Sequence, residues 1–176
     1  EREMATQEMN EIWEVSVEFT VDAPVEKVWT LLGDFGDIGK WATSVLESSS
    51  LVEGLPQEIG CVRACVLSPF PSFNVSSLIV VHEKLLELDN SEHSMTYQVL
   101  TSHIPIIRDI VGNLKLSRSN DDSPGTTRIV WCCKKPSTPD VDKQAFIHAL
   151  ESLYTALVTV DLALLTSCCF EIHYVT

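Results

Sequence analysis

The first strongly patterned segment of the chain alternates apolar and polar residues. From Trp13 to Val21, every second residue is apolar, and the residues between them are glutamate, serine or threonine. Successive side chains of a strand point to opposite faces, so this period of two predicts a strand with one buried and one solvated face. We therefore expect the patterned part of the chain to begin with a strand of a half-buried sheet.

A change of period follows this strand. Pro24 provides a helix start, because its backbone angle suits the first turn and its missing N–H is not needed there. The apolar residues after it fall on one helical face: Val25, Val28, Trp29 and Leu32. We predict a short helix that ends near Gly33 or Gly36, and a second helical turn within residues 37–43.

Strand-like composition dominates the middle of the chain. Six further runs are strand candidates, and they span residues 45–52, 61–67, 75–88, 95–101, 108–116 and 127–135. Residues typical of turns separate them, among them Gly54-Leu55-Pro56, Pro69, Pro71, Asp89-Asn90 and Pro105. Together with the first strand, these runs predict a sheet of seven antiparallel strands.

The longest helical pattern follows the last of these strands. Thr138-Pro139-Asp140 provides its start. The apolar residues of this pattern recur three, four or seven positions apart: Phe146, Leu150, Leu153, Leu157 and Leu164. A helix over residues 140–167 would span roughly 40 Å at about 1.5 Å per residue. It would be long enough to cross the whole face of the sheet.

The length of the chain suits one domain. With 176 residues and 45% hydrophobic content, it can bury one substantial core but hardly two. We expect an α+β fold in which residues 11–168 form a single ligand-binding domain. Residues 1–10 are expected to be a disordered or expression-derived N-terminus, and residues 169–176 a C-terminal tail.

Acidic residues outnumber basic ones by 25 to 12, which gives a formal net charge of −13. This charge repels a phosphate backbone and an anionic membrane surface, so we expect no nucleic-acid partner. The most apolar stretch, residues 156–165, is shorter than the ~20 residues that a spanning helix needs, and we expect no membrane insertion. Because the first residues lack the apolar run of a secretory signal, we expect a cytoplasmic protein.

Six cysteines occur, at positions 61, 65, 132, 133, 168 and 169. Neither the adjacent pairs nor the spacing of Cys61 and Cys65 matches a zinc arrangement with a second pair of ligands. In a cytosolic chain we interpret the cysteines as mostly reduced, buried thiols. A redox or metal role is the alternative interpretation. Our prediction is that the protein uses no metal and no cofactor.

The predicted order of elements resembles the START-like or polyketide cyclase superfamily, and so does the segment from Ala23 to Phe35 (APVEKVWTLLGDF). This superfamily includes the birch-pollen-allergen proteins. The resemblance implies a helix-grip fold, in which a seven-stranded curved antiparallel sheet wraps around a long C-terminal helix and two short helices follow strand 1. It also implies a ligand cavity between the sheet and the long helix.

Two shorter stretches resemble the lachrymatory factor synthase-like proteins of plants in particular: Gly60-Cys61-Val62-Arg63, and EKLLELDN from Glu83 to Asn90. This resemblance implies that Arg63 and Glu83 face the cavity as a catalytic pair. The abscisic acid receptors of the same superfamily have an arginine and a glutamate at these places, but they also need a lysine on the second strand. The segment from Thr43 to Glu47 has no lysine, which disfavours hormone sensing of that kind.

The residues themselves give Arg63 and Glu83 two interpretations. Arg63 lies in a predicted strand that is apolar on both faces, and a buried guanidinium requires an anionic or carbonyl partner such as Glu83. A carboxylate in a cavity can move a proton on a bound substrate, while the arginine stabilises developing negative charge. The alternative is an ion pair that fixes the register of two strands and touches no ligand.

The strand face that carries Glu83 is the predicted wall of the cavity. The predicted ligand-binding residues are Cys65, Phe70, Ser77, Ile79, Val81, Met95, Tyr97, Val99, Phe146, Leu150 and Leu153. Tyr154 on the long helix is expected to lie with them. Plain core packing is the alternative for these side chains. Solvated or structural positions are expected for His82, His93, His103 and His148.

Three functions fit these predictions. The first is a cofactor-free enzyme that isomerises, cyclises or rearranges a small, largely apolar metabolite by acid/base chemistry at Glu83. The second is a carrier or storage protein for such a molecule, and the third is a ligand-gated receptor with the loop from Pro69 to Pro71 as a lid. This fold class hosts all three functions, so the pattern alone does not separate them. We expect a monomer or a weak homodimer.

Overall fold

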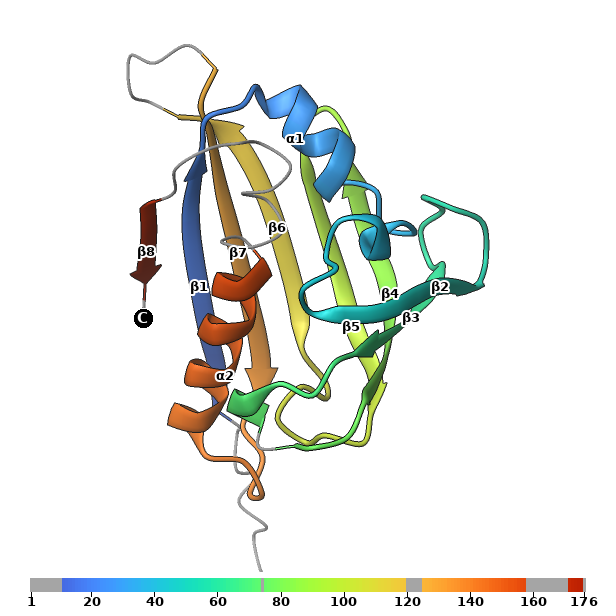
Figure 1. The fold of residues 1–176 in the computed structure, drawn as a ribbon, viewed down its shortest axis with the longest axis vertical. Helices are drawn as coiled ribbons and strands as arrows, with labels where there is room; N and C mark the ends of the chain where they lie inside the picture. Colours follow the sequence, from blue (N-terminus) through green and yellow to red (C-terminus); the bar gives the residue numbers. More distant parts are fainter. Residues whose placement is uncertain (1–10, 74, 120–124, 158–170, 176) are drawn as a thin grey trace, which may run out of the picture.

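A computed structural model describes residues 11–73, 75–119, 125–157 and 171–175. One sheet curves around a helix that lies against its concave face (Figure 1). The strands are β1 (Ile12–Val21), β2 (Leu46–Glu53), β3 (Val62–Leu67), β4 (Ile79–Asp89), β5 (Ser94–Ser102), β6 (Val111–Arg118), β7 (Thr127–Pro136) and β8 (Glu171–Val175). The helices are α1 (Val25–Leu32), α2 (Lys143–Ala156) and the short 3-10 helices η1 (Ile38–Lys40) and η2 (Pro71–Phe73).

The strands of the described residues follow the order β2-β3-β4-β5-β6-β7-β1-β8, and neighbouring strands are antiparallel. All seven predicted strands are present as β1 to β7, which confirms the helix-grip fold class. β8 adds an edge strand that pairs with residues 16–20 of β1. It lies within residues 169–176, where we predicted a tail. Pairing with β8 covers backbone groups that would otherwise form an open sheet edge.

Two strands begin later than their composition predicted. β4 begins at Ile79 rather than at residue 75, because the chain bends between η2 and the sheet. β6 begins at Val111 rather than at residue 108, because the chain turns through Asp109, whose φ is +64°. In both places apolar residues belong to a connecting loop, so their composition alone does not separate loop from strand.

The long helix also begins later than predicted. α2 starts at Lys143 rather than at residue 140, because Asp142 caps it. The Asp142 carboxylate accepts a hydrogen bond of 2.9 Å from the backbone N–H of Ala145, which satisfies one of the free donors of the first turn. The predicted helical residues 158–167 lie outside the described residues.

The core fills the space between the concave face of the sheet and the helices. The inward residues of β1 are all buried, as their alternation predicted: Trp13, Val15, Val17, Phe19 and Val21. Phe146 of α2 packs its ring against Trp13, with ring centroids 5.8 Å apart. This contact fixes one end of α2 on the sheet and leaves the rest of the helix to close a cavity.

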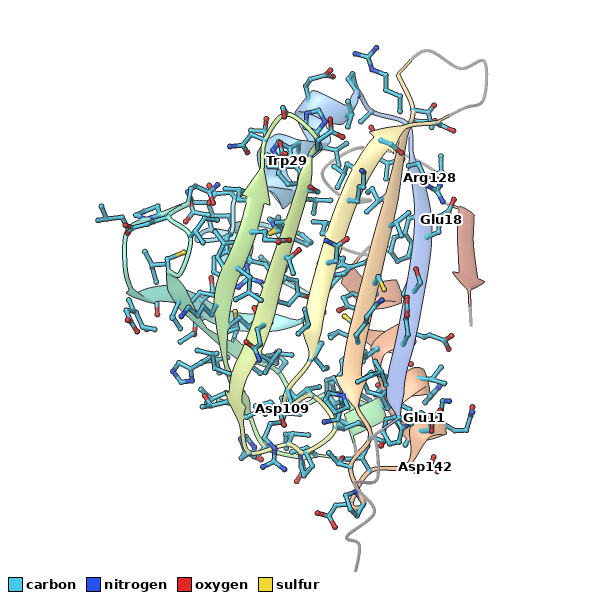
Figure 2. The ribbon with its side chains drawn as sticks, turned by 180° about the vertical axis from the view of Figure 1, so that it is seen from behind. Glu11, Glu18, Trp29, Asp109, Arg128 and Asp142 are labelled. Atoms are coloured by element: carbon cyan, nitrogen blue, oxygen red, sulfur yellow. The ribbon has the colours of Figure 1, made fainter. Side chains whose placement is uncertain are left out.

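The convex face of the sheet carries charged pairs (Figure 2). Arg128 of β7 donates hydrogen bonds of 2.5 and 2.6 Å to the carboxylate of Glu18 on β1. Exposed pairs of this kind contribute about 0–1 kcal/mol each, so the stability of the fold depends mainly on the buried face. Among the described residues, no helix has the length and apolar character needed to cross a membrane.

Candidate functional site

A cavity lies between the concave face of the sheet and α2. The centre of a water molecule can occupy about 80 Å³ of it, several times the roughly 10–15 Å³ that one bound water needs. The residues that line it are Ile38, Val45, Leu46, Arg63, Cys65, Leu67, Phe73, Val81, Glu83, Tyr97, Val99, Ile107, Ile110, Trp131, Leu150, Leu153, Tyr154 and Leu157. Because most of these side chains are apolar, the cavity suits a small, largely apolar molecule.

One ion pair interrupts the apolar wall. Arg63 of β3 and Glu83 of β4 are directly opposite in the strand register. Arg63 Nε donates a 2.7 Å hydrogen bond to Glu83 Oε2, and Arg63 Nη2 forms an ion pair with the same oxygen at 2.6 Å. Their side chains are 4% and 14% exposed. Since both contacts end on Oε2, Oε1 of Glu83 accepts no hydrogen bond from any residue that the structure describes.

The Arg63 guanidinium is held from several sides. Its Nη1 donates a 2.7 Å hydrogen bond to the backbone carbonyl of Phe35, and its Cζ lies 4.1 Å from the centre of the Phe35 ring. Burial acts to lower the pKa of Arg63, but the charge of Glu83 and the hydrogen bonds outweigh it, and the net shift is upward. Arg63 is therefore a permanent, fixed cation at the cavity wall.

Cys65 lies beside this pair and is a thiol rather than a thiolate. Its Sγ is 3.9 Å from Glu83 Oε2. Burial, followed by the nearby Glu83 carboxylate, raises the pKa of Cys65 to about 12. At physiological pH the group does not act as a nucleophile.

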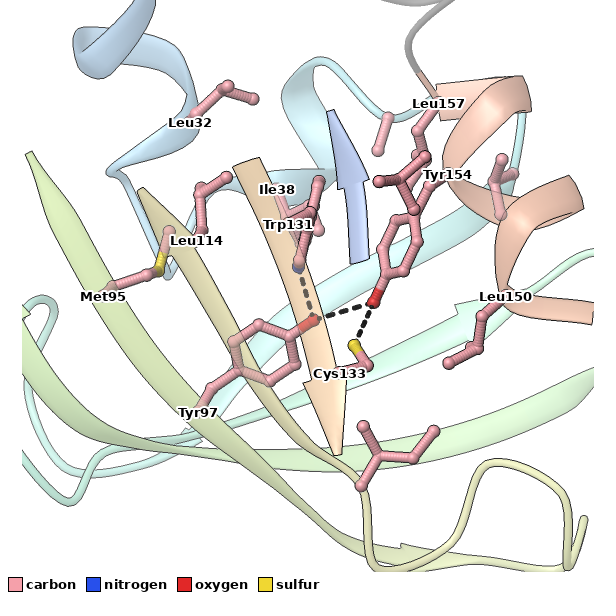
Figure 3. Close-up of a cluster of buried hydrophobic side chains, with 14 of the residues drawn as sticks. Leu32, Ile38, Met95, Tyr97, Leu114, Trp131, Cys133, Leu150, Tyr154 and Leu157 are labelled. Carbon is pink, nitrogen blue, oxygen red and sulfur yellow. Dashed lines mark hydrogen bonds between the residues drawn. The ribbon is translucent and has the colours of Figure 1, made fainter. Parts of the chain in front are cut away.

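A second polar group consists of the side chains of Tyr97, Trp131 and Tyr154, which line the cavity, and of Cys133, which does not line it (Figure 3). The Trp131 Nε1 donates to the Tyr97 hydroxyl at 3.0 Å. The hydroxyls of Tyr97 and Tyr154 lie 3.4 Å apart, and Cys133 Sγ lies 2.7 Å from the Tyr154 hydroxyl. Gly112 makes room for Tyr97, because a Cβ at Gly112 would lie 2.3 Å from the Tyr97 ring.

Gln57 connects the loop after α1 to the hairpin between β2 and β3. Its Nε2 donates to the Gly33 carbonyl at 3.0 Å, and its Oε1 accepts from the Phe35 N–H at 3.3 Å. The same loop supplies the Phe35 carbonyl that binds Arg63. Gln57 adopts a φ of +64°, a region that glycine occupies more readily. Gln57 therefore holds the loop whose Phe35 carbonyl accepts the hydrogen bond from Arg63.

Replacing Gln57 with alanine is expected to loosen this loop. The change removes both hydrogen bonds and should cost about 1 kcal/mol of unfolding free energy, with faster hydrogen exchange at the Phe35 amide. Gln57→Gly removes the same bonds but relieves the backbone strain, so it should cost less than Gln57→Ala. Hydrogen exchange followed by NMR checks both results, and an unchanged rate at Phe35 would contradict this role for Gln57.

The structure brings most of the predicted site residues to the cavity. Those that line it are Arg63, Glu83, Cys65, Val81, Tyr97, Val99, Leu150 and Leu153. Tyr154 joins them, as expected from its place on the helix. The alternation of β3, β4 and β5 is responsible, because it points every second residue inward.

Five other predicted residues lie away from the cavity. Ile79, Met95 and Phe146 are buried in the surrounding core, which is the packing alternative considered above. Phe70 is partly buried, and its ring is tilted by 48° against that of Phe73, with ring centroids 5.6 Å apart. Ser77 is exposed, because β4 begins after it and the strand alternation does not extend that far.

Several lining residues were not among the predicted ones. They are Ile38, Val45, Leu46, Leu67, Phe73, Ile107, Ile110, Trp131 and Leu157. Trp131 could have been found, because it lies in the regular alternation of β7 on the inward face. Ile107 and Ile110 lie in the loop between β5 and β6, where no periodic pattern indicates which side chains point inward.

The histidines and cysteines show no catalytic or metal-binding cluster in the part of the chain that is described. His82 contacts the Thr101 hydroxyl at 3.0 Å through Nδ1, and His93 lies edge-on to Trp29. His103 and His148 are exposed. Cys61, Cys65, Cys132 and Cys133 are free. No three potential metal ligands of the described residues come together.

A curved antiparallel sheet that closes an apolar cavity against a C-terminal helix defines the class of helix-grip proteins. A family model described as "Polyketide cyclase / dehydrase and lipid transport" matches residues 13–160. The chain therefore belongs to this family. A comparison with curated protein sequences gives no match.

Solved structures share the fold. A protein from Nitrosospira multiformis is 23% identical, with a TM-score of 0.64 over 84% of this chain and 95% of that one. An uncharacterised protein from Bacillus thuringiensis is 19% identical, with a TM-score of 0.67 over 86% and 98%. The major latex-like protein 151 of Panax ginseng is 14% identical, with a TM-score of 0.64 over 86% and 98%. At these identities the similarity establishes the fold alone.

Proposed function

We propose that the protein binds a small, largely apolar metabolite in this cavity and isomerises, cyclises or rearranges it by acid/base chemistry without a cofactor. One observation carries the proposal. The Glu83 carboxylate lines an otherwise largely apolar cavity, holds Arg63 through Oε2, and leaves Oε1 without a hydrogen bond from the described residues. A carboxylate so placed has one oxygen available as a base toward a ligand.

In the proposed reaction, Glu83 Oε1 takes a proton from one atom of the ligand and returns it to another atom of the same ligand. The Arg63 guanidinium beside it stabilises the negative charge that the ligand carries between the two steps. The reaction moves one proton between two atoms of the ligand and neither oxidises nor reduces the ligand. The apolar walls limit the access of water, which strengthens both electrostatic interactions.

A carrier or storage protein for the same kind of molecule is the second candidate. Arg63 bonds to Glu83 and to the Phe35 carbonyl, so the ion pair also has a purely structural explanation. A ligand-gated receptor is the third candidate. It is supported by Phe73 of η2, which follows the loop from Pro69 to Pro71 and lines the cavity.

The test compares the protein with its Glu83→Gln variant, which keeps a carbonyl oxygen for Arg63 but takes up no proton from a ligand. Both proteins are incubated with an extract of small metabolites, and bound and released molecules are followed by native mass spectrometry. We expect the parent protein to convert a molecule that the variant merely retains, with a rate in the variant lower by about 10²–10⁴-fold.

Glu87→Gln is the matched control, because Glu87 lies on the same strand and is exposed. This variant should convert the metabolite at the rate of the parent protein. If the parent protein and Glu83→Gln retain the same molecule unchanged, Glu83 has a structural role and the protein is a carrier or receptor.

Several wider expectations belong to the same proposal. The resemblance of Gly60 to Arg63 and of Glu83 to Asn90 supports a plant lachrymatory factor synthase-like protein. The free thiols support a cytoplasmic location. The acidic net charge of −13 supports the expectation that nucleic acid is not a partner. Two expectations remain predictions: that residues 11–168 form a single domain, and that the protein is a monomer or a weak dimer.

A further inference from the structure

The polar group on the cavity wall has one more hydrogen than it uses. Trp131, Tyr97, Tyr154 and Cys133 each carry one polar hydrogen: the indole N–H, two hydroxyls and a thiol. These four groups make three contacts with one another, from Trp131 to Tyr97, between the two tyrosines, and between Tyr154 and Cys133. Four hydrogens thus serve three contacts, and one hydrogen remains.

Which side chain carries the remaining hydrogen depends on which group donates in each of the three contacts. Trp131 can only donate, so the Tyr97 oxygen accepts from it. Tyr154 has one hydrogen and can donate to only one of its two neighbours, which leaves three possible arrangements. In one of them the spare hydrogen belongs to Cys133. In the other two it belongs to the hydroxyl of Tyr97 or of Tyr154.

Only the tyrosines can offer this hydrogen to a ligand. Tyr97 and Tyr154 line the cavity, whereas Cys133 does not. A ligand with an acceptor oxygen therefore favours the arrangements in which a tyrosine hydroxyl has the spare hydrogen. The 3.4 Å between the two hydroxyls is longer than the usual 2.5–3.0 Å of an O–H···O bond, so a ligand oxygen can replace this link at low cost.

The count of four hydrogens holds over the physiological pH range. Burial raises the pKa of Cys133 to about 12, so its thiol stays protonated. Burial also raises the pKa of Tyr97 and of Tyr154 well above the ordinary tyrosine value. The indole N–H of Trp131 does not titrate in this range either, so the four side chains together keep one spare hydrogen-bond donor.

We propose that Tyr97 and Tyr154 form a hydrogen-bond donor site for a carbonyl-type oxygen of the ligand. In the arrangement that does not serve the ligand, the spare hydrogen belongs to Cys133. The inference rests on the proposed function and narrows its ligand to a small apolar molecule that carries such an oxygen. Arg63 lies near the Tyr97 ring, with its Cζ 5.7 Å from the ring centroid. The tyrosines and the Glu83 carboxylate line the same cavity, so the proposed ligand lies in contact with both kinds of group.

The test uses two probes of similar shape, acetophenone and isopropylbenzene, of which only the first has an acceptor oxygen. Calorimetry should show that the parent protein binds acetophenone about three- to tenfold more tightly than isopropylbenzene, the factor expected for one neutral hydrogen bond. The triple variant Tyr97→Phe/Tyr154→Phe/Trp131→Phe also removes the indole donor that the loss of the Tyr97 oxygen would free, and it should lose this preference while it still binds isopropylbenzene. Cys133→Ala should keep the preference or increase it, because the spare hydrogen then always belongs to a tyrosine.

The infrared carbonyl stretch of acetophenone gives a second measurement that needs no variant. In the parent protein it should lie at lower frequency than in a hydrocarbon solvent, because a hydrogen bond weakens the C=O bond. An unshifted stretch, equal affinities for the two probes, or a preference that persists in the triple phenylalanine variant would overturn the donor site. If neither probe binds the parent protein, the ligand cavity of the proposed function fails as well.

Discussion

Replacing Arg63 with methionine is expected to lower the free energy of unfolding by about 3–5 kcal/mol. The change leaves the Glu83 carboxylate, which is 14% exposed, without the cation whose Nη2 and Nε now lie 2.6 and 2.7 Å from Glu83 Oε2. It also removes the donor to the Phe35 carbonyl. Urea unfolding, followed by tryptophan fluorescence, measures the loss.

Two further variants test the physical reason for this loss. Arg63→Met/Glu83→Leu removes both charges and should recover much of the stability, because an apolar pair carries no uncompensated charge. Arg128→Met breaks the pair with Glu18, whose contacts are equally short but exposed, and should cost less than about 1 kcal/mol. If Arg63→Met cost no more than Arg128→Met, the ion pair in the cavity would behave like a surface contact.

The sequence predicted the sheet well because burial on one face imposes a simple period. Each inward residue of β1 could be named from alternation. Alternation did not decide the faces of Arg63 and Glu83, because their strands are apolar on both faces, and only the resemblance implied that both face the cavity. Their direct pairing follows from the register of β3 and β4. Two charged residues in otherwise apolar strands thus indicated a buried ion pair, and the resemblance was needed to place that pair at the cavity.

The same rule fails where a strand ends. Ser77 was placed on the cavity wall by extending the alternation of β4, but the strand begins only at Ile79. Ile107 and Ile110 reach the cavity from a loop, where the direction of a side chain depends on turns such as the one at Asp109. Loop positions depend on tertiary contacts, so a single sequence does not predict them.

The hydrogen-bonded group on the wall shows a different limit of sequence reasoning. Tyr97 and Tyr154 were each expected near the ligand, but Trp131 and Cys133 of β7 were not. The four side chains come from β5, β7 and α2, and their distances depend on how α2 packs on the sheet. Periodicity gives the face of each element but not the distances between elements.

Replacing Phe146 with alanine is expected to lower the free energy of unfolding by about 3–5 kcal/mol, because a fully buried aromatic ring leaves a cavity when it is removed. Phe146 packs against Trp13 and does not line the ligand cavity, so the affinity for isopropylbenzene should change little while the protein is folded. Urea unfolding and calorimetry with this probe measure the two effects separately.

Two residues of the same helix serve as controls for Phe146. Leu153→Ala removes a partly buried side chain that lines the cavity, so it should cost less stability than Phe146→Ala but alter the affinity for the probe. His148→Ala changes an exposed position and should shift stability by less than about 0.5 kcal/mol. If Phe146→Ala changed probe affinity as strongly as Leu153→Ala, Phe146 would contact the ligand, as its helical spacing first suggested. With the expected result, one end of α2 anchors the helix to the sheet and the residues beyond it form the ligand site.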